Sequence, residues 1–169
     1  MSTPHPAGPQ LVVMGVTGSG KTTVGIALAH ELGVPFADGD DFHGEANIAK
    51  MAAGTPLDDA DRLPWLRSVG AWLGERPGGG VIGCSALKRS YRDLLREYAP
   101  AARFVHLHGT PEVIHRRVAE RAGHFMPESL VESQFATLEP LGPDEAGVVL
   151  DFDLPVADLV AAYLDEARA

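Results

Sequence analysis

The sequence predicts an α/β fold in which one parallel, five-stranded sheet is flanked by helices. Apolar runs typical of buried strands alternate with segments of helical periodicity, no internal repeat is found, and no linker separates a second domain. A length of 169 residues fits one domain with a sizeable core. We expect residues 10–169 to form that domain and the proline-containing residues 1–9 to be a disordered leader.

The elements follow from local patterns along the chain. The first predicted helix ends at Gly33, a residue suited to a helix C-cap, and Ser90-Tyr91-Arg92-Asp93 resembles a capping box that opens a later helix. Thr110 and Pro111 offer a cap residue and a proline at the first helical position. Strands are predicted at 11–14, 35–38, 81–86, 103–108 and 148–151, and helices at 23–33, 45–53, 58–73, 90–98, from 110 onward, 128–139 and 156–168.

Residues 15–22 read Gly-Val-Thr-Gly-Ser-Gly-Lys-Thr, the full pattern of a phosphate-binding loop, and they lie between the first predicted strand and helix. The glycines let backbone N–H groups turn toward phosphates, and the helix N-terminus that follows favours anions. Lys21 is expected to reach the β- and γ-phosphates, and the Thr22 hydroxyl to bind Mg²⁺. The loop predicts a P-loop NTPase fold that binds a nucleoside triphosphate through Gly15, Thr17, Gly18, Ser19, Gly20, Lys21, Thr22 and Thr23.

Side chains that follow the other strands at the same edge of the sheet are candidates for chemistry. Asp38 and Asp40 follow the second strand, where a carboxylate can orient Mg²⁺ through its water shell or accept the proton of an attacking hydroxyl. A solvated acidic turn is the alternative interpretation. The third strand lacks the terminal aspartate that many P-loop ATPases and GTPases use for Mg²⁺, so a motor or switch protein is disfavoured.

The net charge limits the kinds of binding partner, and the cysteine content bears on the cellular compartment. With 14 Lys and Arg against 23 Asp and Glu, the chain is net acidic, so no broad nucleic-acid or anionic-membrane surface is expected. No apolar stretch approaches the length of a membrane span. Cys84 is the single cysteine, which excludes an internal disulfide, fits a cytoplasmic protein and is interpreted as a small apolar residue in a buried strand.

Strings throughout the chain after the leader resemble the gluconokinases, a family within the shikimate-kinase-like and nucleoside-monophosphate-kinase-like P-loop kinases. The most specific strings are Asp-Arg-Leu-Pro-Trp-Leu at 61–66, Cys-Ser-Ala-Leu-Lys at 84–88 and His-Phe-Met-Pro at 124–127, in this order. The family often has serine at position 22, and Thr22 keeps the hydroxyl. The resemblance implies ATP-dependent phosphorylation of D-gluconate on its terminal hydroxyl, giving 6-phospho-D-gluconate and ADP, by a protein that is a homodimer.

The resemblance also implies roles for particular residues. Asp40 is expected to orient the acceptor hydroxyl and take its proton, and Asp38 to hold a Mg²⁺-bound water. Gluconate is an anionic polyol, and any of three cations, Arg62, Lys88 and Arg92, could bind its carboxylate. The expected catalytic residues are Lys21, Asp40 and Arg121, the substrate-binding residues Asp40, His43, Arg62, Lys88, Arg92, His124 and Gln134, and the metal ligands Thr22 and Asp38.

Residues 117–130 resemble the lid that closes over ATP in such kinases. Arg117 and Arg121 are four residues apart and share one helical face, where they are expected to bind ATP and neutralise charge on the transferring phosphoryl group. A basic surface stripe is the alternative. By fold analogy, the loop with Asp153 and Pro155, after the fifth strand, is expected to hold adenine.

Two other functions stay open on the sequence. A sister small-molecule kinase of the shikimate type would share the fold and Lys21, but it is not expected to carry the strings at 61–66 and 84–88 together. A catalytically silent nucleotide-binding module would tolerate the loss of Lys21, Thr22 or Asp40, and all three are present.

Overall fold

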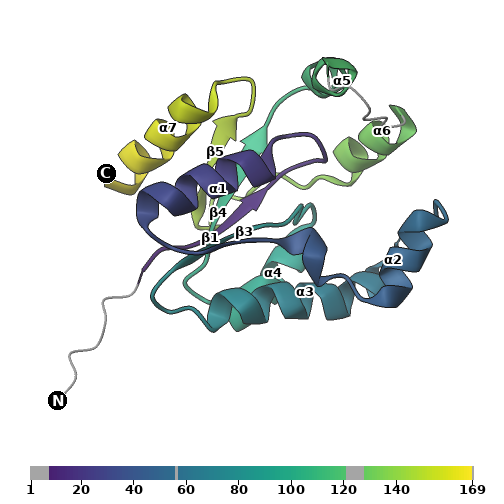
Figure 1. Cartoon of the computed structure of the whole chain (residues 1–169), viewed down its shortest axis with the longest axis horizontal. Coiled ribbons are helices and arrows are strands. Elements are labelled where there is room, and N and C mark those ends of the chain that lie inside the picture. The colour runs from purple at the N-terminus through teal and green to yellow at the C-terminus, as the bar shows by residue number, and fades with distance from the viewer. Residues whose placement is uncertain (1–7, 56, 121–127, 169) are drawn as a thin grey trace.

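The computed structural model describes residues 8–55, 57–120 and 128–168, and within them five strands form one sheet (Figure 1). The strands pair in parallel in the order β2-β3-β1-β4-β5. Their bounds are β1 (Gln10–Met14), β2 (Phe36–Asp38), β3 (Gly80–Gly83), β4 (Arg103–His108) and β5 (Gly147–Asp151). The predicted α/β fold with a five-stranded parallel sheet is confirmed. The predicted leader falls almost entirely outside the described residues.

Helices cover both faces of this sheet (Figure 1). On one face α1 (Lys21–Leu32) and α7 (Val156–Arg168) pack over the strands, and on the other face α3 (Asp59–Gly74) and α4 (Arg89–Tyr98) do so. The short helices η1 (Gly39–Phe42) and α2 (Glu45–Ala52) lead from β2 to α3, while α5 (Pro111–Glu120) and α6 (Glu128–Thr137) lie between β4 and β5 along the chain. Within the described parts of the chain, no helix is long and apolar enough to cross a membrane.

The central strand shows why the sequence folds into these layers. Alternate side chains of a strand point to opposite faces, so Leu11 and Val13 join the core under α1 and α7, and Val12 and Met14 join the core under α3 and α4. Both faces are covered, which explains the continuous apolar run of β1. The edge of the sheet where the strands end therefore carries the loops that can bind ligands.

Some predicted boundaries are confirmed and others are wrong. α1 is followed by Gly33 with a left-handed φ of 68°, as the predicted C-cap requires. The predicted capping box at Ser90 is not formed, because α4 begins at Arg89 and Ser90 lies inside its first turn. β3 ends at Gly83 rather than at residue 86, because the chain turns away and Ala86 takes a left-handed φ of 44°.

Candidate active site

The P-loop connects β1 to α1 at the carboxyl edge of the sheet. Its Gly18 and Gly20 have φ values of 86° and 96°, a backbone region that favours glycine. The Ser19 hydroxyl is buried and has no hydrogen-bond partner among the described residues. A buried polar atom is normally satisfied, so this hydroxyl fits a loop whose remaining partner is a bound phosphate.

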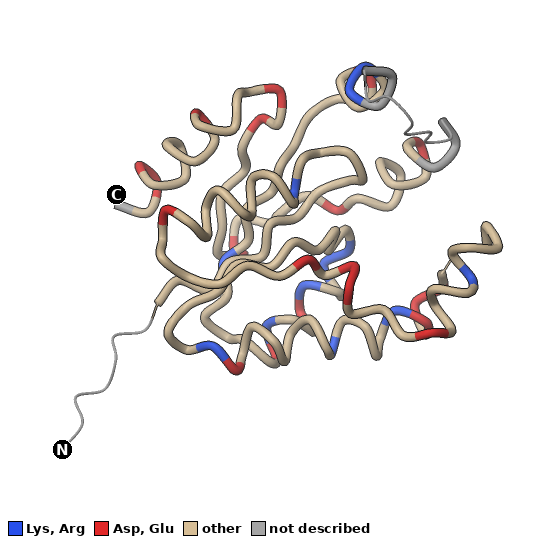
Figure 2. Tube along the Cα trace, viewed as in Figure 1, with Lys and Arg blue, Asp and Glu red and all other residues tan. Residues whose placement is uncertain are grey.

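Lys21 lies over this loop. Its Nζ donates hydrogen bonds to the carbonyl oxygens of Gly15 and Val16, both at 3.0 Å. Burial lowers the pKa of Lys21, while the neighbouring Asp40 carboxylate opposes the shift. The ammonium therefore occupies a poorly hydrated position in which a phosphate would be a strongly bound partner. Figure 2 shows the acidic positions of η1 beside the basic position at the start of α1.

Asp38 and Asp40 are held on one turn at the end of β2. The Asp38 carboxylate accepts a hydrogen bond from the Thr22 hydroxyl at 3.3 Å and another from the backbone N–H of Asp40 at 2.9 Å, and so caps η1. A hydroxyl and a carboxylate are oxygen ligands of the kind Mg²⁺ takes, so Thr22 and Asp38 fit the predicted ion. The described residues contain no group of three His, Cys, Asp or Glu that could hold a metal, whereas Mg²⁺ commonly uses one or two carboxylates plus phosphates and water.

Trp65 on α3 holds this turn in place. Its indole N–H donates to the carbonyl oxygen of Gly39 at 2.7 Å, and its ring stacks on His43 with 4.3 Å between centroids. The His43 Nδ1 accepts from the amide of Asn47 at 3.2 Å. Burial lowers the pKa of His43, Asp40 opposes this and Arg62 adds to it. With Nδ1 accepting, a neutral ring would carry its proton on Nε2, where it could donate to a substrate hydroxyl.

Arg62 and Lys88, two of the cations predicted for the substrate, converge on Tyr91. The Arg62 guanidinium donates to the Tyr91 hydroxyl at 2.9 Å, and both cations lie over its ring, at 5.7 Å for Arg62 and 5.5 Å for Lys88. Asp59 accepts a hydrogen bond from the Tyr91 hydroxyl and pairs with the Lys88 ammonium at 3.2 Å. We name these four residues the Tyr91 cluster. Tyr91 was not among the predicted site residues, although its place one turn after Lys88 puts the two side chains on neighbouring positions of the helix surface.

Arg92 does not join that cluster, and its placement argues against the predicted substrate role. The side chain is fully buried. It binds both carboxylate oxygens of Glu145, with Nε–Oε2 and Nη2–Oε1 distances of 2.7 and 3.0 Å. Its remaining donors reach the carbonyl oxygens of Ala86, Leu87 and Pro140. Because these partners occupy the guanidinium, no side of it is left for a substrate carboxylate.

Arg117 bridges the P-loop and the loop after β5. Its guanidinium donates to the carbonyl oxygen of Ser19 at 3.2 Å and lies 5.0 Å from the ring centroid of Phe152. Asp153 and Pro155 follow Phe152 and are exposed. Arg117 therefore lies between the P-loop, where the phosphates are expected, and the loop that is expected to hold adenine. The predicted roles of Arg121 and His124 fall on residues outside those described.

Gln134, predicted at the substrate, reaches the P-loop instead. The backbone N–H of Thr17 donates to its Oε1 at 2.5 Å, and its Nε2 donates to the Thr17 hydroxyl at 2.6 Å.

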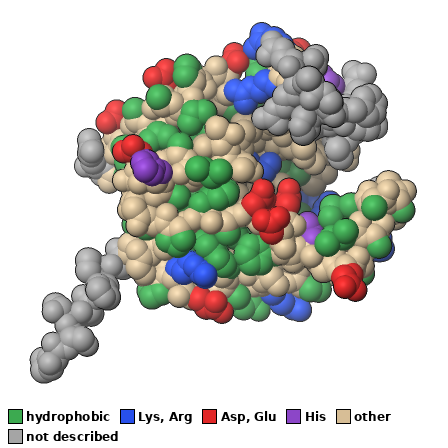
Figure 3. Space-filling view, in the orientation of Figure 1, with side chains coloured by type: hydrophobic (Ala, Val, Ile, Leu, Met, Phe, Trp, Pro, Cys, Tyr) green, Lys and Arg blue, Asp and Glu red, His purple; other side chains and the backbone are tan. Residues whose placement is uncertain are grey.

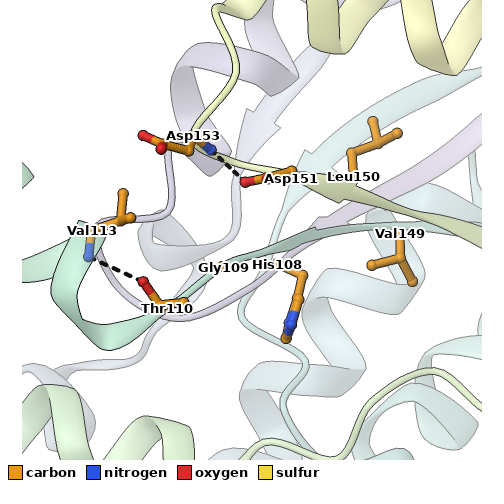
Figure 4. Close-up of a pocket in the computed structure, with 8 residues that line it drawn as sticks. All are labelled: His108, Gly109, Thr110, Val113, Val149, Leu150, Asp151 and Asp153. Atoms are coloured by element: carbon orange, nitrogen blue, oxygen red, sulfur yellow. Dashed lines mark hydrogen bonds between the residues drawn. The ribbon is translucent and has the colours of Figure 1, made fainter.

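A cavity of about 470 Å³ lies where β4 and β5 end (Figure 4). His108 and Val149 line it from the sheet, and Asp153 lines it from the following loop. Lys21 and Asp40 are not part of its lining. The cavity adjoins the predicted adenine side but excludes the residues expected to do the chemistry. Figure 3 shows a separate hollow beside α2, with acidic side chains at its edge.

The chain is similar in sequence and in fold to known proteins. A family model described as shikimate kinase matches residues 17–134. The chain is 45% identical over 158 residues to the thermoresistant gluconokinase of Escherichia coli K12, covering 91% of this chain and 90% of that protein. It is 51% identical over 138 residues to the gluconokinase of Gluconobacter oxydans, covering 80% and 78%. A crystal structure of a gluconokinase from Sinorhizobium meliloti is similar with a TM-score of 0.88 at 47% identity, covering 98% and 94% of the two chains.

Proposed function

The chain belongs to the gluconokinase family of shikimate-kinase-like P-loop kinases, and we infer that it transfers the γ-phosphoryl group of ATP to the terminal hydroxyl of D-gluconate. The products are 6-phospho-D-gluconate and ADP. The single observation that carries the chemistry is the grouping of Lys21, Thr22, Asp38 and Asp40 at one edge of the sheet, since this set unites phosphate, metal and proton-accepting groups.

In the proposed reaction, the acceptor oxygen forms a bond to the γ-phosphorus while the bond from that phosphorus to the β,γ-bridging oxygen breaks. Asp40 accepts the proton of the hydroxyl and orients its lone pair, a role suited to an exposed carboxylate beside Lys21. Lys21 leaves the carbonyl oxygens of Gly15 and Val16 to bind the β- and γ-phosphates. Mg²⁺ held by Thr22 and Asp38 would neutralise phosphate charge.

The acceptor carboxylate is proposed to bind the Tyr91 cluster. Arg62 and Lys88 supply two positive charges there, and Asp59, the acid that pairs with Lys88, is largely exposed. A substrate carboxylate can therefore replace or share that counter-ion at a small cost, because exposed ion pairs contribute little. His43 is proposed to bind a hydroxyl of the sugar acid through its free N–H.

A coupled ADP-release assay with several acceptors tests this function. Gluconate should stimulate ADP release far above shikimate, other sugar acids and nucleoside monophosphates. Preference for shikimate would assign the chain to a sister kinase activity, equal release without any acceptor would indicate a hydrolase, and no release with any acceptor would indicate a silent nucleotide-binding module.

The homodimer implied by the family resemblance and the cytoplasmic location expected from the sequence stay predictions. Light scattering coupled to gel filtration measures the first, and cell fractionation the second.

A further inference from the structure

We propose that Gln134 is a positioning residue that holds the P-loop in its phosphate-binding shape, and that it does not bind the sugar acid. The planar carboxamide makes a two-point contact with Thr17, accepting from the backbone N–H and donating to the hydroxyl. One contact therefore restrains both the peptide group and the side chain of a loop residue that lies 117 positions away in the sequence. The proposal rests on the kinase function argued above.

The helix that carries Gln134, α6, is packed against the hydrophobic core. Val131, Phe135 and Leu138 lie on one face of the chain around α6, and they contact the same core that contains Val16 of the P-loop. The backbone N–H of Glu139 donates to the carbonyl oxygen of Leu87 at 2.7 Å, which ties the end of this segment to the loop after β3. The carboxamide is therefore placed by packing, before any ligand binds.

The contacted segment is the part of the loop that most needs support. Thr17 lies between Gly15 and Gly18, which both have positive φ. A glycine-rich backbone can adopt many other conformations, so this segment loses its shape easily without a restraint. The N–H of Thr17 points to Gln134, so the phosphates depend on the N–H groups that follow it. Arg117 restrains the next part of the loop through the carbonyl oxygen of Ser19. Without Gln134, ATP binding would have to order this segment, and affinity for both nucleotides would fall.

The test measures ADP binding by calorimetry without acceptor, together with kcat and the KM for gluconate. Gln134→Ala should weaken ADP binding roughly tenfold, as expected for losing two hydrogen bonds, and lower kcat, while the KM for gluconate changes less than about twofold. Thr17→Ser keeps the hydroxyl and the backbone N–H that meet Gln134, so its ADP affinity should be closer to wild type than that of Gln134→Ala. Thr17→Val keeps only the backbone contact and should fall between the two. Adding Thr17→Val to Gln134→Ala should weaken ADP binding no further, because Gln134 acts through Thr17.

Thr137→Ala is the matched control, because this residue lies on the same helix and its hydroxyl bonds only to the carbonyl oxygen of Ser133.

Three results would overturn the proposal. A raised KM for gluconate with unchanged ADP affinity would assign Gln134 to the acceptor, and unchanged values throughout would deny it a role. Tighter ADP binding would mean that the contact holds an unproductive loop. Circular dichroism checks folding, and Thr17→Val alone decides the matter if Gln134→Ala does not fold. ADP affinity is measured without gluconate, so this result stands even if another acceptor proves to be the substrate.

Discussion

Replacing Arg92 should damage stability and leave substrate recognition intact. In Arg92→Met the Glu145 carboxylate, only 1% exposed, loses two hydrogen bonds and keeps those from Arg96 and from the N–H of Gly142, both at 3.0 Å. Breaking a buried ion pair from one side costs about 3 to 5 kcal/mol, because the remaining charge is left buried. A domain of ordinary stability has about 5 to 15 kcal/mol in total, so the loss is a large share.

Urea denaturation followed by circular dichroism measures this loss. With a slope of about 2 kcal/mol per molar urea, the midpoint should fall by roughly 2 M. Arg67→Ala, which removes an exposed arginine of α3, is the control and should change the free energy of unfolding by less than about 0.5 kcal/mol. The double variant Arg92→Met, Glu145→Met should be more stable than Arg92→Met alone, since the buried Glu145 charge is then removed and Arg96 keeps its ion pair with Asp93.

The ion pair between Arg92 and Glu145 also predicts that the free energy of unfolding falls at acid pH. Burial alone would raise the pKa of Glu145, but hydrogen bonds from Arg92 and Gly142 lower it to about 2. A depressed carboxyl pKa stabilises the fold above the unfolded value near 4.5, and this contribution is lost as the pH falls toward 2. The reasoning is refuted if Arg92→Met unfolds at the wild-type urea concentration while its KM for gluconate rises selectively. That result would restore the substrate role expected from the sequence.

Two other predictions test the Tyr91 cluster and a buried histidine. Arg62→Ala and Lys88→Ala should each lower the ratio of gluconate to glucitol kcat/KM about tenfold or more, and wild-type ratios in both variants would exclude them as carboxylate ligands. Burial, with nearby His108 and Arg92, lowers the pKa of His106 to about 4. Between pH 7 and pH 5 this histidine therefore becomes protonated in the unfolded chain but stays neutral in the folded chain. Its contribution should lower the free energy of unfolding by about 2 kcal/mol over that range. Urea titrations at both pH values should show that fall reduced in His106→Leu, and equal falls in the variant and wild type would contradict it.

The P-loop could be predicted in full because its signal is local. Residues 15–22 carry both the required residue types and the required flanking pattern, and in the structure they run from the end of β1 into the first turn of α1, which begins at Lys21. The strand order was not predicted in detail, but the parallel sheet followed from the alternation of strand and helix patterns. The end of β3 was misplaced because an apolar run shows burial and does not show where pairing stops.

The roles that sequence reasoning could not assign depend on distant partners. Whether Arg92 faces substrate or core depends on Glu145, which lies 53 positions away. The place of Gln134 depends in the same way on its contact with Thr17. In both cases the residue type permits either role, and the hydrogen bonds that the fold creates support a structural one.

The most direct test of the proposed phosphoryl transfer compares Asp40→Asn with Asp38→Asn and wild type. Calorimetry measures the affinity for ADP, and steady-state kinetics measure the turnover of gluconate. Asp40 is proposed to take the proton of the acceptor hydroxyl. Asp40→Asn should therefore keep its affinity for ADP within about twofold while kcat falls by about two orders of magnitude or more. Asp38→Asn should show a raised Mg²⁺ requirement instead, because its partner is the Thr22 hydroxyl. Near wild-type turnover by Asp40→Asn would contradict the account and move the proton-accepting role to another group.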